Sequence, residues 1–243
     1  MSTVLILGAT SDMGVAIAEK FAENKFDVQL AARNPEQLKP IQSDITIRYH
    51  VGCTLHAFDA LKFSTHASFF NGLAAKPDIT VCLFGIMDEE SLAFENWNIT
   101  EQMIDTNFTG AVSILNIVAK YYMTLKKGTI VGISSVAGER GRESKLIYGS
   151  SKAAFTAYLS GLRNKLYKQN IHVVSVKPGF VYTRMTENQA LPKLLTAYPA
   201  AVADTVYQAV QKKKNVVYVK WFWRYIMLII KLIPEFQFKK MSL

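Results

Sequence analysis

Short apolar runs rich in β-branched residues alternate with longer stretches of helical periodicity along the first 220 residues of the chain. The short runs predict strands at residues 3–7, 28–32, 55–58, 78–84, 129–133, 171–176 and 216–219. The longer stretches predict helices at residues 15–23, 35–48, 63–74, 96–123 and 147–166. Strands and helices that alternate at this spacing favour an α/β fold with a doubly wound parallel sheet.

The composition favours one globular domain without a metal site or a disulfide framework. A chain of 243 residues, half of them apolar, can bury a full core, and neither a linker nor a repeat divides it. Cys53 and Cys82 fit no metal spacing, and the four histidines are scattered. The apolar start of the chain has no basic region before it, so it predicts a strand rather than a signal peptide, and a cytoplasmic protein.

The turn after the first strand predicts an anion-binding site. Residues 8–14, Gly-Ala-Thr-Ser-Asp-Met-Gly, link this strand to an amphipathic helix. Free backbone amides at the N-terminus of a helix point toward a phosphate group. Glycine at position 8 permits the tight turn, and glycine at position 14 lets the helix approach the sheet closely. The residues predicted to hold phosphate are Gly8, Thr10, Ser11, Met13 and Gly14.

The end of the second strand predicts the kind of dinucleotide. Arg33 lies nineteen residues after Gly14, where dinucleotide folds place the residue that contacts the adenosine ribose. No carboxylate is present there to accept from the ribose hydroxyls, and a guanidinium suits a 2′-phosphate. NADP(H) is therefore the expected cofactor; the alternative is an exposed arginine without a ligand. Asp59 either contacts the adenine or starts a turn, and Gly85 ends the fourth strand close to the cofactor.

Residues 134–152 carry the predicted chemistry. Tyr148 and Lys152 are four residues apart, so they share one face of a predicted helix. A phenol has a pKa of about 10, and an ammonium one turn away lowers it, which suits proton exchange with a carbonyl oxygen. Ser135 ends the preceding strand and is placed to hydrogen-bond the same oxygen. The alternative is a surface Tyr–Lys pair at ordinary helical spacing.

Two further features accompany this motif. Asn107 interrupts an apolar stretch, and a buried Asn needs hydrogen-bond partners, so it is either a structural clamp or part of a proton path. Pro178 and Gly179 stop the sixth strand and turn the chain over the carboxyl ends of the sheet, where ligands lie in open α/β folds. Residues 184–200 follow and are expected to border an apolar pocket.

These residues, in this order, resemble the short-chain dehydrogenase/reductase family over residues 3 to about 220. The resemblance implies a Rossmann-type sheet of about seven strands and hydride transfer between a nicotinamide and a carbonyl or alcohol. It implies that Tyr148 is the general acid/base, that Lys152 lowers the pKa of Tyr148 and binds the nicotinamide ribose, and that Ser135 holds the substrate oxygen. It also implies that Asn107 completes a catalytic tetrad by supporting a water relay.

The resemblance extends to the cofactor contacts, with two departures. Thr183 and the backbone of Val181 would hold the pyrophosphate and the carboxamide. The usual glycine turn has a third glycine where this chain has Asp12, which either caps the helix or points at phosphate. The usual Asn-Asn-Ala-Gly after the fourth strand is here Cys-Leu-Phe-Gly at residues 82–85, so side-chain hydrogen bonds made there must be replaced or absent.

The last part of the chain combines basic charge with apolar residues. Residues 212–243 hold eight Lys or Arg against one Glu, which is +7 of the total net charge of +9. Thirteen residues from Trp221 onward make a helix of about 20 Å, too short for a hydrocarbon core of ~30 Å. On this helix the charged residues form one narrow stripe, at Lys220, Arg224, Lys231 and Glu235. The pattern predicts a helix lying on an anionic membrane surface; the alternative is a helix packed on the body or on a second subunit.

The tail also resembles a bacterial branch of the family that reduces the keto group of a polyprenyl-phosphoryl ketopentose, which would give a lipid-linked substrate. The expected protein is an NADP(H)-dependent oxidoreductase with a catalytic domain at residues 1–220 and a C-terminal amphipathic helix at 221–243, peripheral on the cytoplasmic membrane face. The alternatives are a soluble reductase of a small apolar ketone, with the tail as an oligomer contact, and a dinucleotide-binding regulator without turnover. A homodimer is expected from the resemblance, and nucleic acid is not, because the lysines lack a recognition motif.

Overall fold

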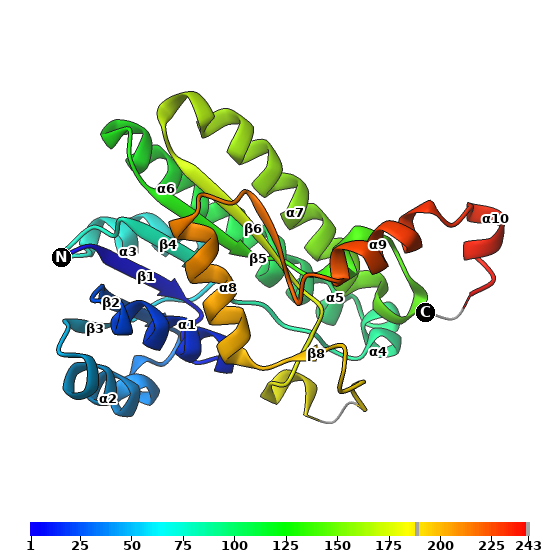
Figure 1. Ribbon diagram of the computed structural model, residues 1–243, viewed down its shortest axis with the longest axis horizontal. Helices are drawn as coiled ribbons and strands as arrows, with labels where there is room; N and C mark the ends of the chain where they lie inside the picture. The colour runs from blue at the N-terminus through cyan, green and yellow to red at the C-terminus, as the bar shows by residue number, and fades with distance from the viewer. Residues whose placement is uncertain (188–189, 242–243) are drawn as a thin grey trace.

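A computed structural model of the chain describes residues 1–187 and 190–241 and contains one seven-stranded parallel sheet (Figure 1). The strand order is β3-β2-β1-β4-β5-β6-β9. The strands are β1 (Thr3–Leu7), β2 (Asp27–Ala32), β3 (Cys53–Ala57), β4 (Ile79–Cys82), β5 (Thr129–Ile133), β6 (His172–Pro178) and β9 (Val216–Val219). The strand order reverses between β1 and β4, and in open α/β sheets ligands bind at the carboxyl ends beside such a point. The predicted fold class is confirmed.

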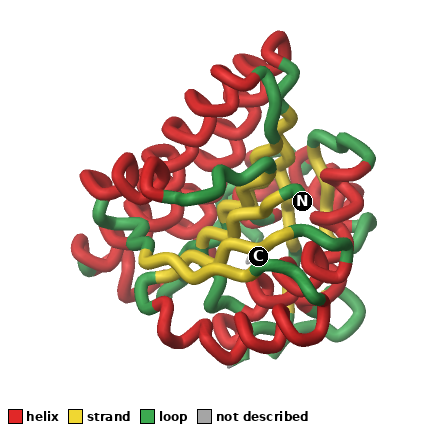
Figure 2. Tube along the Cα trace, turned by 90° about the vertical axis from the view of Figure 1, so that its left-hand side faces the viewer, coloured by secondary structure: helices red, strands yellow, loops and turns green. Residues whose placement is uncertain are grey.

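Helices cover both faces of the sheet (Figures 1 and 2). One layer contains α1 (Asp12–Glu23), α2 (Lys39–Tyr49) and α8 (Pro199–Gln211), and the other contains α3 (His66–Gly72), α6 (Gly110–Leu125) and α7 (Leu146–Leu166). Alternate residues of the central strand β1 pack into the two layers: Val4 and Ile6 into the first, Leu5 and Leu7 into the second. Both faces of the strand are buried, which explains its unbroken apolar sequence.

The helix predicted at residues 96–123 is interrupted. The chain here forms α4 (Glu90–Glu95), α5 (Trp97–Ile104), a π-helical turn at Asp105–Thr109, and then α6. Asn96 has extended backbone, and its side chain accepts a hydrogen bond from the amide of Asn98, so it begins α5 rather than lying inside a helix. The sequence analysis also missed α8, which starts at Pro199 in the first helical position that suits proline.

The tail packs on the body of the protein through one of its faces. It forms α9 (Trp223–Leu232) and α10 (Glu235–Phe238), and Trp223 and Met227 are buried together with Val136. The opposite side of α9, called the outer face below, is exposed and consists of Tyr225, Leu228, Ile229 and Leu232. Among the described residues, no helix has both the length and the hydropathy needed to cross a bilayer.

Small parts of two predicted segments lie outside the described residues. These are residues 188–189 of the expected pocket border and residues 242–243 of the tail. The rest of the pocket border includes the short strands β7 (Phe180–Val181) and β8 (Thr196–Ala197), which pair in parallel after β6.

Candidate active site

Two cavities meet at the carboxyl ends of the central strands. The first, of about 230 Å³, is lined by predicted catalytic and cofactor residues, namely Ser135, Tyr148, Lys152, Pro178, Gly179, Val181 and Thr183. The second, of about 170 Å³, is lined by the other predicted cofactor residues Gly8, Thr10, Ser11, Arg33 and Asp59. The residues that line both cavities are Met13, Leu83, Gly85 and Met185. The two cavities therefore form one cleft, and its ends are called the catalytic end and the nucleotide end below, after the residues predicted for each; Gly14 and Asn107 line neither cavity.

Tyr148 lies in the first turn of α7 and is partly exposed to the catalytic cavity. Burial raises the pKa of its phenol, and a side-chain hydrogen bond with Ser135 acts in the opposite direction. Ser135 follows β5, and its hydroxyl also accepts a hydrogen bond from the amide of Ala137 at 3.1 Å. The two hydroxyl groups that the sequence pairs for chemistry thus line the same cavity.

Lys152 is buried behind the tyrosine, with only 4% of the residue exposed. Its Nζ donates to the carbonyl oxygen of Ile133 at 3.2 Å and lies 5.9 Å from the centroid of the Tyr148 ring. Burial lowers the pKa of this amine to about 8. The pKa of Tyr148 is therefore raised rather than lowered as expected, because burial of the phenol outweighs the hydrogen bond with Ser135.

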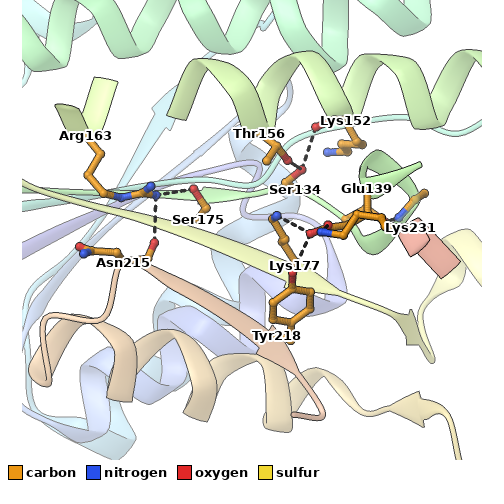
Figure 3. Close-up of polar contacts among 12 residues, drawn as sticks. Ser134, Glu139, Lys152, Thr156, Arg163, Ser175, Lys177, Asn215, Tyr218 and Lys231 are labelled. Atoms are coloured by element: carbon orange, nitrogen blue, oxygen red, sulfur yellow. Dashed lines mark hydrogen bonds and ion pairs between the residues drawn. The ribbon is translucent and has the colours of Figure 1, made fainter. Parts of the chain in front are cut away.

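The end of β5 is tied to α7 by Ser134, which precedes the catalytic serine (Figure 3). Its hydroxyl donates to the carbonyl oxygen of Lys152 at 2.9 Å and lies 2.6 Å from the hydroxyl of Thr156. The chain also approaches α7 closely at Gly138, where a Cβ would lie 2.6 Å from the amide nitrogen of Ala153. These contacts fix the loop that carries Ser135 against the helix that carries Tyr148.

Asn107 is a clamp on the backbone beyond β4. Its Oδ1 accepts from the amide of Ile86 at 2.8 Å, and its Nδ2 donates to the carbonyl oxygen of Ile86 at 2.9 Å and to Ser151 at 3.1 Å. A Cβ at Gly85 would lie 2.8 Å from Oδ1 of this asparagine and 3.2 Å from Nζ of Lys152. Of the two alternatives for Asn107, the geometry shows the structural clamp directly.

Glu90, which was not predicted from the sequence, binds the N-terminus of the helix that carries Tyr148. From the first turn of α4, its two carboxylate oxygens accept from the amides of Ile147 at 2.8 Å and Tyr148 at 3.1 Å. A carboxylate at the N-terminus of a helix satisfies free amides and interacts favourably with the helix dipole. Glu90 is 58 residues from Tyr148, so no local pattern identifies this contact.

The nucleotide end is built on the predicted glycine turn. Gly8 has a φ of +100°, and a Cβ there would lie 2.8 Å from the amide nitrogen of Phe84, so a side chain would be excluded. Ser11 is the N-cap of α1: its hydroxyl donates to the carbonyl oxygen of Gly8 and accepts from the amide of Gly14 at 3.1 Å. A tight turn with amides at a helix N-terminus fits a dinucleotide pyrophosphate.

Asp12 neither caps the helix nor remains an uncompensated charge. Ser11 takes the capping position, and Asp12 is the first residue of α1. Its carboxylate accepts from the backbone amide of Arg184 at 2.8 Å and from Nε of the same residue at 3.2 Å. Arg184 also donates to the carbonyl oxygen of Thr10. The guanidinium therefore offsets the negative charge that replaces the usual glycine.

Arg33 and Asp59 border the nucleotide end from neighbouring strands. Arg33 is exposed after β2, where its guanidinium can reach a ligand in the second cavity. Asp59 starts a turn after β3, with Oδ1 accepting from the amide of Leu61 at 3.1 Å. The turn-forming alternative for Asp59 is observed, and the residue lines the cavity as well.

A buried carboxylate joins the catalytic loop to the tail. Glu139 forms ion pairs with Lys177 at the end of β6 and with Lys231 of α9, and it accepts from the Tyr218 hydroxyl at 2.7 Å (Figure 3). Burial raises the pKa of this carboxyl, but the hydrogen bonds from its three partners outweigh that effect and lower the pKa to about 2. The basic stripe predicted for lipid contact is thus partly used inside the protein.

Trp223 forms part of the wall of the catalytic cavity, and it too was missed. Its indole donates to the carbonyl oxygen of Leu195 at 3.2 Å and lies where any side chain at Gly179 would be. The Trp-rich composition of the tail was the only available signal, and it suggested lipid contact rather than a pocket wall.

Comparison with known proteins agrees with this geometry. A family model described as short chain dehydrogenase matches residues 2–193. The chain belongs to this family. An uncharacterized oxidoreductase of Mycobacterium tuberculosis is 30% identical over 241 residues, which cover 98% of this chain and 96% of the relative. This short-chain dehydrogenase is thus an oxidoreductase of the family, as the sequence predicted.

Two solved structures show the same fold as this short-chain dehydrogenase. A short-chain dehydrogenase from Sphingobium yanoikuyae in complex with NADPH has a TM-score of 0.83 at 22% identity, over 97% of each chain. A 3-oxoacyl-[acyl-carrier protein] reductase from Brucella melitensis in complex with NAD has a TM-score of 0.82 at 21% identity, over 92% of this chain and 97% of that one. Structures of this fold therefore include complexes with both forms of the cofactor.

Proposed function

We propose that this short-chain dehydrogenase interconverts a carbonyl and an alcohol with NADP(H) as the hydride carrier. The observation that carries the proposal is the placement of Ser135, Tyr148 and Lys152 in one cavity that continues into the nucleotide end of the cleft. A bound nicotinamide supplies or accepts the hydride. In reduction, the Tyr148 hydroxyl donates a proton to the carbonyl oxygen, and Ser135 hydrogen-bonds the same oxygen as negative charge develops on it.

Lys152 would bind the nicotinamide ribose and keep positive charge behind the phenol, and Asn107 holds the adjoining backbone. Thr183 and the Val181 backbone line the same cavity and would contact the pyrophosphate and the carboxamide.

The preference for NADP(H) rests on Arg33. Its exposed guanidinium lines the nucleotide end, and β2 ends in two alanines without a carboxylate. A guanidinium can bind a 2′-phosphate with two parallel hydrogen bonds, whereas the ribose hydroxyls of NAD are usually bound by a carboxylate.

The proposed substrate is an apolar carbonyl compound, and a lipid-linked one fits the tail. The catalytic cavity is lined mainly by apolar side chains, among them Met87, Phe180, Met185 and Trp223. Methionine side chains adapt to irregular apolar ligands. The wall formed by Trp223 connects the cavity to α9, so the substrate and the tail share one part of the molecule.

The outer face of α9 is proposed to rest on an anionic membrane surface. Its four side chains are between 49% and 72% exposed at helical spacing, although exposed apolar stripes are rare in isolated soluble proteins. Arg224 of the same helix and Lys239 and Lys240 after α10 are also exposed. A second copy of the chain would place these cations against each other, whereas anionic headgroups neutralise them.

The reductase proposal is tested by replacing the tyrosine. Tyr148→Phe should lower turnover of NADPH with a ketone such as 2-decanone by roughly 10²- to 10⁴-fold, the usual contribution of a general acid. NADPH binding, followed by the change in nicotinamide fluorescence, should remain. Tyr158→Phe is the matched control, because Tyr158 is on the same helix and its hydroxyl donates to Asn116 instead. Equal turnover by Tyr148→Phe and the wild type would remove Tyr148 from the mechanism.

A further inference from the structure

Arg142 lies in the loop between the catalytic serine and tyrosine and lines the catalytic cavity. It also lines a groove between this loop and α10, together with Phe238 and Lys239. The side chain is therefore placed at the side of the cleft away from the nucleotide end. Nothing in the proposed reaction uses this guanidinium.

The charge of Arg142 has no partner among the described residues. Its Nε is buried without a hydrogen bond, no carboxylate forms an ion pair with it, and burial lowers the pKa of its guanidinium. A buried charged donor without an acceptor is costly and rare in native proteins. A ligand cannot reach the buried Nε itself, but the two terminal nitrogens of the same guanidinium are not buried and have no acceptor among the described residues, so a ligand can supply one to them.

Two other partly buried arginines have acceptors for their guanidinium groups, so the lack of an acceptor at Arg142 is unusual in this chain. Arg140, two residues earlier, donates to the carbonyl oxygens of Ile230 and Ile233 at 2.5 and 2.6 Å and pairs with Glu235. Arg163 donates to two carbonyl oxygens and to a serine hydroxyl. The fold provides acceptors for both of these guanidinium groups, and Arg142 is left without them.

The charged side chains that line the catalytic cavity also favour an anionic ligand. The charged side chains that line it are Arg142, Lys145 and Lys152, and no carboxylate lines it within residues 1–187 and 190–241. Lys152 is explained by the catalytic site. The glycine turn and the arginine that would hold the cofactor phosphates line the other cavity, and Thr183, which would contact the pyrophosphate from this one, carries no charge. Arg142 and Lys145 thus leave positive charge on the substrate side of the cleft.

We infer that the substrate is an amphiphilic anion, whose carboxylate or phosphate binds Arg142 while its apolar part fills the cavity beside Trp223. A guanidinium binds either group through two parallel hydrogen bonds, and the shared chemistry is a planar or tetrahedral oxyanion. The inference rests on the proposed reductase function, since it assigns the specificity of the same cavity.

The test measures binding of three ligands to the full chain loaded with NADP⁺ by isothermal titration calorimetry. The ligands are decanoate, decyl phosphate and decanol, which share one apolar chain and differ in the head group. The wild type should bind at least one of the two anions roughly 10- to 100-fold more tightly than decanol, as expected for hydrogen bonds to a charged group. The comparison of the two anions distinguishes a carboxylate from a phosphate.

Three variants make the result specific. Arg142→Met should remove the preference for the anion, and Arg142→Lys should keep part of it because the charge is retained. Arg48→Met is the matched control, because Arg48 is an exposed arginine of α2 that pairs with Asp44. Thermal unfolding of each variant shows whether it is folded.

Several outcomes overturn the inference. They are equal binding of decanol and the anions by the wild type, no binding of any of the three, or an unchanged preference in Arg142→Met. Failure of the reductase proposal has a different signature, namely absence of NADPH oxidation by the wild type with both neutral and anionic ketones. The two failures are therefore distinguishable.

Discussion

The proposed preference for NADP(H) depends on one residue, Arg33. Arg33→Ala should weaken NADPH binding roughly 10- to 100-fold, because it removes charge-assisted hydrogen bonds to the 2′-phosphate, and should change NADH binding little. Fluorescence titration with both cofactors measures the two dissociation constants, and Arg48→Ala serves as the control. Similar losses for NADPH and NADH would contradict the assignment to the 2′-phosphate.

At the same scale, the sequence predicted residues that the fold brings together in one cleft, but not all of their partners. Spacing was enough to place Tyr148 and Lys152 on one helical face, because helical periodicity is local. The partners of Asp12 and Tyr148 are 172 and 58 residues away, at Arg184 and Glu90. The pKa of Tyr148 depends on burial by the whole fold, so the sequence predicted its direction wrongly for the protein without ligands.

At the scale of elements, the ion pairs of Glu139 join the loop after β5 to β6 and to α9, and their contribution to stability can be measured. Glu139→Gln leaves Lys177 with an uncompensated charge and should lower the free energy of unfolding by about 3 kcal/mol at neutral pH. Urea unfolding monitored by circular dichroism gives this difference. The exposed Glu143 lies in the same loop, and Glu143→Gln should change little.

The pH dependence of the same variant has a defined sign. The pKa of Glu139 is lowered from 4.5 to about 2, so its contribution to stability is present above about pH 4.5 and is lost as the pH falls toward 2. The difference in unfolding free energy between the wild type and Glu139→Gln should therefore shrink over that interval. A constant difference down to pH 2 would show that the carboxylate is not the stabilising form.

The sequence predicted elements well where a pattern is continuous and poorly where it is broken by capping or by long-range packing. All seven strands of the sheet were predicted, because apolar runs are typical of strands buried on both faces. The break at Asn96 depends on a single capping side chain, and the π-helical turn at Asp105–Thr109 gives no local sequence signal. The packing of α9 depends on Val136 and the loop that follows it, which the periodicity of the tail does not contain.

For the whole molecule, the membrane proposal rests on the outer face of α9. The double variant Ile229→Glu, Leu232→Glu should lose binding to phosphatidylglycerol vesicles, because it places two carboxylates on the outer face of α9 without altering the buried Trp223 and Met227. Vesicle co-sedimentation measures the bound fraction. Ile47→Glu is the control, since Ile47 is 73% exposed on α2, in another part of the protein.

Absence of vesicle binding by the wild type would contradict the membrane proposal. Size-exclusion chromatography with light scattering would then show whether the outer face joins two copies of the chain instead. Reduction of a soluble ketone is measured without vesicles, so this result leaves the assignment of Tyr148 unaffected.

The π-helical turn before α6 makes the site depend on an exact residue count. A π-turn holds one residue more than an α-turn, and each residue of a helix advances its neighbours by about 100° around the axis. Deletion of Phe108 or Thr109 would give a more regular helix and rotate the preceding chain, including Asn107 and Glu90, relative to α6. Asn107 would then face away from Ile86, and the amide of Tyr148 would lose its acceptor. A helix made more regular by this deletion would therefore lose the contacts of Asn107 and Glu90 that support the site.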